Sequence, residues 1–172
     1  ILDIGWYYGL IAGIAGLAGT LFGGWSADHM VKKTGNRNWY IWIPFASTII
    51  AIPFALNTYL WIPDGYVAVY FYFIPVFFGG WYLAPCLAAN HFLVGIRMRA
   101  MASAVLLFVL NLIGLGLGPM FTGFVSDFLT PEYGVDGLRY ALSITILFNI
   151  WCAAHYYWCL KTINQDFDRA PA

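Results

Sequence analysis

The sequence predicts an all-α fold, a polytopic membrane bundle whose helices cross the bilayer several times. Two observations carry this prediction. Hydrophobic residues make up 62% of the chain and charged residues only 9%, whereas about a quarter of the residues in an average soluble domain are charged. The charges also gather in short segments between long uncharged runs, and this pattern is typical of a membrane protein with several spans.

Five uncharged runs are long enough to cross the hydrocarbon core, which needs about 20 apolar residues of helix. They span residues 6–27, 39–62, 66–92, 100–125 and 138–160. Arg139, near the start of the last run, is the exception to their lack of Asp, Glu, Lys and Arg. The sequence therefore predicts five transmembrane helices in one partial domain, residues 1–172.

The positive charges predict which helix ends face the cytoplasm, because Lys and Arg are enriched in short cytoplasmic connections. The turns after the first and third runs, together with the C-terminal tail, contain Lys32, Lys33, Arg37, Arg97, Arg99, Lys161 and Arg169. The opposite connections contain mostly Asp and Glu. We therefore expect an integral protein of the plasma membrane, such as a bacterial inner membrane, with a cytoplasmic C-terminus.

Several classes of function lack support in the sequence. The eight acidic and eight basic residues cancel, so there is no positive field to attract nucleic acid. Three cysteines, Cys86, Cys152 and Cys159, lie in apolar runs without the spacing of a metal site. Motifs for a catalytic nucleophile, a phosphate-binding loop or paired carboxylates are also missing. We expect no enzyme activity, no cofactor and no metal.

Glycines repeat at four-residue intervals along much of the first run and return in the fourth. Small residues let membrane helices approach closely, and the resulting packing contacts hold the helices together. The positions expected at helix interfaces are Gly9, Gly13, Gly19, Gly23, Gly114, Gly118, Pro119 and Gly123. The spacing leaves open whether the partner of the first run lies in this chain or outside it.

Breaks and polar groups in the third and fourth runs mark a candidate substrate pathway. Pro75, Gly79, Gly80 and Pro85 interrupt the third run, as expected where a helix bends around a cavity and forms a gating element. The candidate pathway residues are Tyr70, Tyr72, Asn90 and Asn111. Asn111 lies near mid-membrane, about 16 Å from the cytoplasmic start of its run at 1.5 Å per residue. It either bonds a neighbouring helix or belongs to a polar pathway.

The segment around Asp28 resembles a family signature. Gly24-x-x-x-Asp28 followed by Lys32 and Lys33 is similar to the signature turn of the major facilitator superfamily, in the copy between helices 8 and 9. Later motifs follow in the family's order, namely Arg97-x-Arg99-Ala-x-Ala-Ser-Ala, Gly114-x3-Gly118-Pro119-x3-Gly123, Ser126-Asp127 and Gly137-Leu-Arg139. The chain departs from the signature at His29 and Val31, where Arg and Gly are usual. The pattern is most similar to members near the spinster-like branch.

The resemblance implies that the chain forms helices 8–12 of the C-terminal half, and that helix 7 and the N-terminal half are absent. It implies a secondary transporter or facilitator that moves a small organic solute by alternating access, with the bilayer, the missing half and a coupling ion as partners. The implied gate consists of Gly24, Asp28, Lys32, Lys33, Arg37, Arg97 and Arg99, with Asp28 bonded to free amides of the absent helix 5. The alternative is a non-transporting membrane scaffold or receptor on the same bundle.

Overall fold

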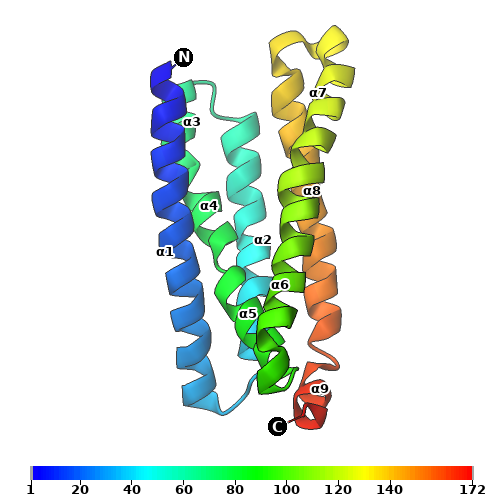
Figure 1. The fold of residues 1–172 in the computed structure, drawn as a ribbon. Coiled ribbons are helices and arrows are strands. Elements are labelled where there is room, and N and C mark those ends of the chain that lie inside the picture. Colours follow the sequence, from blue (N-terminus) through cyan, green and yellow to red (C-terminus); the bar gives the residue numbers. More distant parts are fainter. Residues whose placement is uncertain (1, 172) are drawn as a thin grey trace.

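The computed structural model describes residues 2–171, and all regular structure in this range is helical (Figure 1). The elements are α1 (Leu2–Thr34), α2 (Trp39–Leu60), α3 (Gly65–Phe71), α4 (Phe73–Gly80), α5 (Leu83–Phe92), η1 (Ile96–Met98), α6 (Arg99–Leu110), the π-helix η2 (Asn111–Leu117), α7 (Gly118–Tyr133), η3 (Gly134–Asp136), α8 (Gly137–Cys159) and α9 (Ile163–Arg169). The helical content and the long apolar helices confirm the predicted all-α membrane helix bundle.

Four helical stretches are long and apolar enough to cross a membrane, namely Gly5–Thr34, Trp39–Leu60, Gly65–Phe92 and Ile96–Cys159. The last stretch has 64 residues, about 96 Å of straight helix and roughly three times the thickness of the hydrocarbon core. The chain reverses at η3, where Gly134 has a φ of 58°, and α8 runs back along α7 (Figure 1). This stretch therefore contains the fourth and fifth predicted runs as two antiparallel helices.

The third apolar run consists of three consecutive short helices, α3, α4 and α5. Proline has no N–H group, so Pro75 cannot bond the carbonyl of Phe71 and Pro85 cannot bond the carbonyl of Trp81. The helix breaks next to each of these carbonyls, between α3 and α4 and between α4 and α5. The run therefore bends twice, at the level of the sequence interruptions.

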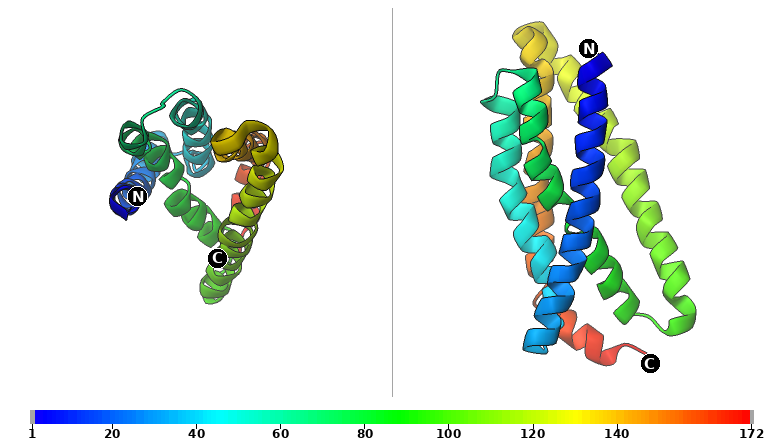
Figure 2. Two further views of the ribbon diagram at one scale, coloured as in Figure 1. Left: turned by 90° about the horizontal axis from the view of Figure 1, so that it is seen from above. Right: turned by 90° about the vertical axis from the view of Figure 1, so that its left-hand side faces the viewer.

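The helices pack as neighbours in a chain of contacts. Helix α1 lies along α4 and also touches α2 and α5, while α2 packs on α8 and α8 packs on α7. Seen from above, α1 and α6 lie at opposite sides of the bundle (Figure 2). Large apolar side chains such as Phe124, Phe128 and Trp151 are exposed. A bilayer tolerates this exposure, because lipid tails solvate apolar surface.

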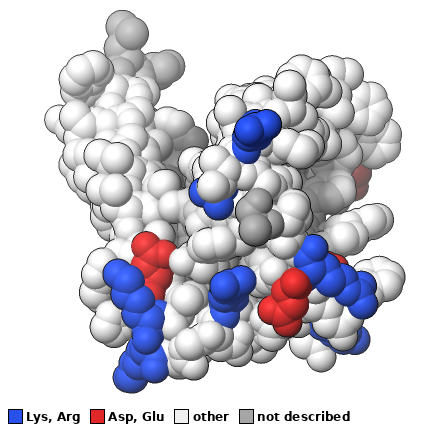
Figure 3. Space-filling model, turned by 60° about the horizontal axis from the view of Figure 1, so that its bottom comes forward, with Lys and Arg blue, Asp and Glu red and all other residues white. Residues whose placement is uncertain are grey.

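The two ends of the bundle differ in charge. All lysines and arginines except Arg139 lie at the end that also holds the C-terminus, and they spread across that face (Figure 3). We call it the basic end. The opposite, acidic end contains Asp64, Asp127, Glu132 and Asp136. In the folded bundle, the connections rich in Lys and Arg therefore lie at one end, and the connections rich in Asp and Glu lie at the other.

A buried cluster lies at the basic end, where the short helix α9 turns under the bundle (Figure 1). The sequence analysis did not predict α9. Its residues Ile163 and Phe167 are only 3% and 4% exposed, and they lie on one face because they are four residues apart. They pack in one cluster with Ala27 of α1 and Tyr40 of α2, so α9 joins the ends of several helices.

Candidate functional site

The end of α1 is tied to the start of α2 by the acidic residue of the signature segment. Asp28 accepts a hydrogen bond of 2.8 Å from the hydroxyl of Tyr40, whose side chain is buried in the first turn of α2. A hydrogen bond to a carboxylate is stronger than one between neutral groups. The resemblance implies that Asp28 bonds helix amides outside this chain, and the structure supplies a partner within it.

Small residues on the same face of α1 bring α5 close. Ala27 has no exposed surface, and a methyl group added at Gly24 would lie 3.0 Å from the Cβ of Ala84 in α5. The buried position of Ala27 and the close approach at Gly24 both require small side chains, because most larger groups would push neighbouring helices apart. The first glycine of the signature therefore has a packing role, one turn before Asp28.

The polar turn begins later than the sequence indicates. Lys32 and Lys33 were expected in the turn, but this expectation is wrong because both lie in the last turn of α1, which continues to Thr34. The helix ends at Gly35, whose φ of 71° is easily adopted by glycine and whose N–H bonds the carbonyl of Val31 at 2.8 Å. The helix continues through Lys32 and Lys33 because residues 25–34 contain no glycine or proline.

The remaining cations of the predicted gate are spread over the basic end. Arg37 lies in the connection between α1 and α2, with its guanidinium 5.7 Å from the centre of the Phe92 ring. Arg97 lies in η1 and Arg99 begins α6, and both are exposed. Within residues 2–171, none of these cations pairs with a carboxylate in an ion pair. A gate held closed by ion pairs therefore stays a prediction.

Two glycines of the predicted interface lie where α1 meets the third apolar run. A Cβ added at Gly19 would overlap the backbone carbonyl of Phe77, and one added at Gly23 would overlap the backbone of Trp81. The backbone of α1 thus touches α4 at Phe77 and also touches Trp81, the residue that directly follows α4, as small residues allow. The partner of this part of the first run lies in the chain itself.

A hydrogen bond crosses the same contact. The Thr20 hydroxyl of α1 lies 2.9 Å from the carbonyl of Gly16 in its own helix and 3.3 Å from the carbonyl of Gly80 in α4. Gly80 is the last residue before the second break of the third run, where carbonyl groups lose their helical partners. Thr20 therefore supplies a donor at the break.

Other predicted interface positions have no tight neighbour. Within the described chain, a Cβ would meet open space at Gly9, Gly13, Gly114 and Gly123. At Gly118, which begins α7 beside Pro119, the nearest atom is a carbonyl oxygen of the preceding turn, at 3.7 Å. The predicted contact of these positions with a further helix stays a prediction.

The candidate pathway residues do not form one cluster. Tyr72 lies between α3 and α4 and lines a pocket at the acidic end, whereas the nearby Tyr70 is 60% exposed and lies outside the lining. Asn90 is 18 residues further on, about 27 Å of helix, and its buried amide nitrogen has no hydrogen-bond partner within residues 2–171. Asn111 donates to the Leu107 carbonyl of its own helix at 2.7 Å.

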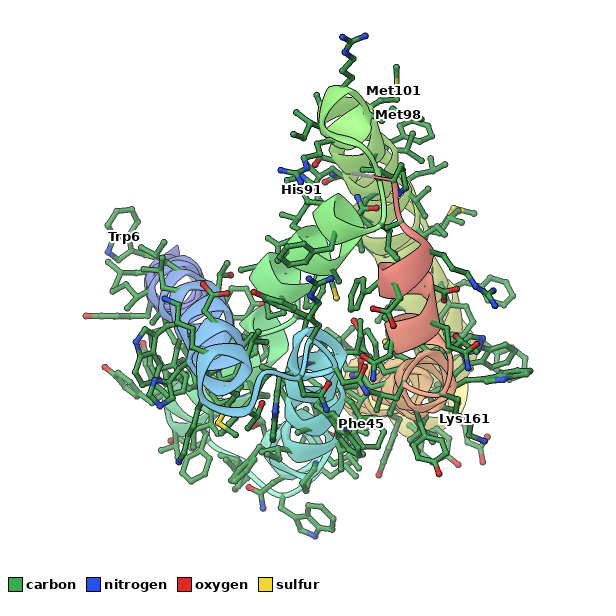
Figure 4. The ribbon with its side chains drawn as sticks, turned by 90° about the horizontal axis from the view of Figure 1, so that it is seen from below. Trp6, Phe45, His91, Met98, Met101 and Lys161 are labelled. Carbon is green, nitrogen blue, oxygen red and sulfur yellow. The ribbon has the colours of Figure 1, made fainter. Side chains whose placement is uncertain are left out.

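A polar contact that was not predicted joins α5 and α6. The Nε2 atom of His91 lies 2.6 Å from the hydroxyl of Ser103. Figure 4 shows His91 on α5, beside the start of α6 that Met98 and Met101 mark. Both residues are equally far along the chain from Arg97 in the connection. This symmetry about an antiparallel turn was a signal that could have predicted the pair.

Arg139 is the one Lys or Arg residue at the acidic end, and its hydrogen bonds explain why it lies there. Its guanidinium donates to the carbonyls of Tyr59, Leu60 and Ile62 at 2.8, 3.2 and 3.3 Å. It also donates to Asp136 at 3.1 Å in an ion pair. Carbonyls at a helix C-terminus have no helical donors and attract cations. Arg139 therefore caps α2 and holds it to α8.

The comparison with known proteins supports a family. The chain is 32% identical over 156 residues to an MFS-type efflux pump of Mycolicibacterium smegmatis (strain ATCC 700084 / mc(2)155). This similarity supports membership in the major facilitator superfamily. The matched residues cover 91% of this chain and 35% of the pump, so the chain spans about a third of the length of this major facilitator. No family model matches the chain, and no solved structure matches it significantly.

Proposed function

We propose that this chain forms helices 8–12 in the C-terminal half of a major facilitator transporter that exports a small organic solute by alternating access. The observation that carries the proposal is the similarity to an efflux pump along 91% of the chain. Because the chain spans 35% of that pump, we assign transport to a protein that also contains the remaining helices. The high aromatic and low charged content of the chain, 20% and 9% of its residues, favours an organic solute over an ion.

The third apolar run is the element that we expect to move during transport. Its two breaks separate α3, α4 and α5, and each break leaves backbone groups that can exchange partners at low cost. The middle piece, α4, is held to α1 by the close contact at Gly19 and by the hydrogen bond from Thr20 to Gly80. Bending at the breaks can therefore open one end of the run while α4 stays in place.

We propose that the basic end faces the cytoplasm and that Asp28 belongs to its gate. The charge asymmetry follows the rule that Lys and Arg remain on the cytoplasmic side. The hydrogen bond between Asp28 and Tyr40 joins α1 to α2, next to the close contact of Gly24 with α5. A change at Asp28 should therefore alter how the cytoplasmic ends of three helices move together.

Dye export by cells tests the proposed function. The protein is expressed from its own gene in cells with reduced endogenous efflux, and accumulation of ethidium, rhodamine 6G and N-phenyl-1-naphthylamine is compared with an empty-vector strain. We expect lower accumulation of at least one dye in the expressing cells, reversed when the proton gradient is collapsed if protons drive the export. Equal accumulation of all three dyes would argue against export of organic solutes.

The role of Asp28 is tested in the same assay with a matched charge control. Asp28→Asn should reduce the initial export rate several-fold without changing the amount of protein in the membrane. Asp168→Asn removes one negative charge from α9 at the same end and should leave the rate unchanged. Equal rates for these two variants would remove Asp28 from the gate, even where dye export itself is observed.

A further inference from the structure

A pocket of about 350 Å³ opens at the acidic end, between α1, α2, α3 and α8. Its wall includes Tyr8, Tyr59, Tyr72 and Arg139, and most of its other lining residues are apolar. The volume lies within the range of about 300–1,000 Å³ that is usual for small-molecule sites, and such sites combine apolar walls with a few polar groups. Its Tyr8 lies 16 residues before Gly24 in α1, about 24 Å of helix, so the pocket is at the other end of the bundle from the gate contacts.

The tyrosines come from three different parts of the chain. Tyr8 of α1 and Tyr72 stack with their ring centres 5.0 Å apart and their planes 22° from parallel. The ring of Tyr59, from α2, lies 6.4 Å from that of Tyr72 at an angle of 42°. An aromatic guest gains both buried apolar area and favourable ring contacts beside such a group.

One hydroxyl at the pocket can donate a hydrogen bond to a guest. The Tyr8 hydroxyl donates to the Tyr72 hydroxyl across 3.1 Å. The hydroxyl of Tyr59 is a second side-chain partner of Tyr72. A phenol is both donor and acceptor, so whichever of these two hydroxyls donates to the other, one of them keeps a proton for a further acceptor. The three tyrosines therefore favour a guest with an oxygen acceptor.

The charges at the pocket favour an uncharged guest. The guanidinium of Arg139 repels a cation, yet four of its five N–H donors are already engaged by backbone carbonyls and by Asp136. The Asp136 carboxylate also offsets the positive charge, at 3.1 Å. An anion would lose its hydration without a free partner for its charge, which is costly in an apolar site.

We propose that this pocket binds a small, uncharged aromatic molecule that carries a hydrogen-bond acceptor, with Tyr72 as the central contact. The inference goes beyond the proposed export function, because it does not require the bound molecule to be the exported solute. A direct binding measurement tests this proposal. The dye-export assay does not, because a molecule that binds in the pocket need not be exported.

The test uses the protein expressed from its own gene, purified in detergent, with 2-acetylnaphthalene as the probe in equilibrium dialysis. We expect saturable binding that weakens about tenfold in Tyr72→Ala and several-fold in Tyr72→Phe, which keeps the ring and loses the donor. Tyr66→Ala is the matched control, because Tyr66 lies in the neighbouring helix α3, is exposed and is outside the lining. Its affinity should equal that of the unmodified protein.

Charged analogues complete the test. Naphthalene-2-sulfonate and 2-naphthyltrimethylammonium should bind at least about tenfold more weakly than the uncharged probe, since the pocket leaves no free charged partner. Absence of saturable binding, equal losses in Tyr66→Ala and Tyr72→Ala, or equal affinity for a charged analogue would each overturn the proposal. If Tyr72→Ala fails to fold, Tyr72→Phe decides, and an unchanged affinity in that variant overturns it.

Discussion

Replacement of Gly23 by alanine should destabilise the bundle, because the backbone of α1 touches another backbone segment at this position. A Cβ at Gly23 would lie 2.5 Å from the Cα of Trp81 and 2.8 Å from its carbonyl carbon. Carbon atoms are best separated by about 3.5–4.0 Å, so α1 and the backbone at Trp81, which directly follows α4, would have to part by about 1 Å. The obstructing atoms belong to backbone, which cannot rotate away as a flexible side chain can.

The expected cost follows from overpacking. Forcing one extra carbon into a close-packed interface usually costs about 1–3 kcal/mol. Gly16→Ala makes the same chemical change on the same helix, where a Cβ meets open space within the described chain. In that control the cost should be absent, and the better helix propensity of alanine adds a gain of up to about 1 kcal/mol.

Unfolding of the purified protein in detergent measures this difference. The fraction unfolded is followed by tryptophan fluorescence during titration with a denaturing detergent, for the unmodified protein, Gly23→Ala and Gly16→Ala. We expect Gly23→Ala to unfold at a clearly lower detergent fraction than Gly16→Ala. The same midpoint for both variants would refute the close backbone contact between Gly23 and Trp81.

Two further contacts give predictions of their own. Arg139→Ala should lower the free energy of unfolding by about 2 kcal/mol, because carbonyls at the end of α2 lose a charged donor, and Arg139→Lys should restore little since lysine lacks the planar fork; full rescue by lysine in the same titration would contradict the capping role. Phe167→Ala should release α9, with a local cost of about 3 kcal/mol, which hydrogen exchange would report as faster exchange of α9 amides. Asp168→Ala is the control for α9, and equal exchange in both variants would show that α9 is not held by Phe167.

Much of the fold could be predicted from hydropathy and charge. Long apolar runs indicated the helices, because an uncharged stretch of about 20 residues is long enough to cross the hydrocarbon core of the bilayer as a helix. The breaks in the third run were also predictable, since Pro75 and Pro85 cannot donate the helical hydrogen bond. Helix α9 was not predicted, because its seven residues mix charged and apolar groups and form a helix that is held by the cluster around Ala27 and Tyr40.

The candidate site was less predictable than the fold. Glycine spacing pointed to close contacts along α1, but it could not distinguish Gly19 and Gly23, which touch α4 and the adjoining Trp81, from Gly9 and Gly13, which face open space. A glycine has no side chain that would record its neighbour, so its partner depends on the approach of another helix. The same holds for Asp28, whose hydrogen-bond partner was set by the position of α2.

The sequence by itself determined that the chain is a membrane helix bundle with one basic and one acidic end, because the cost of placing charges in lipid acts on each segment separately. Only the tertiary structure decided which groups meet. It joined Asp28 to Tyr40 and Arg139 to the end of α2, and it assembled Tyr8, Tyr59 and Tyr72 into one pocket. These contacts depend on distances between helices, which packing sets and local sequence does not encode.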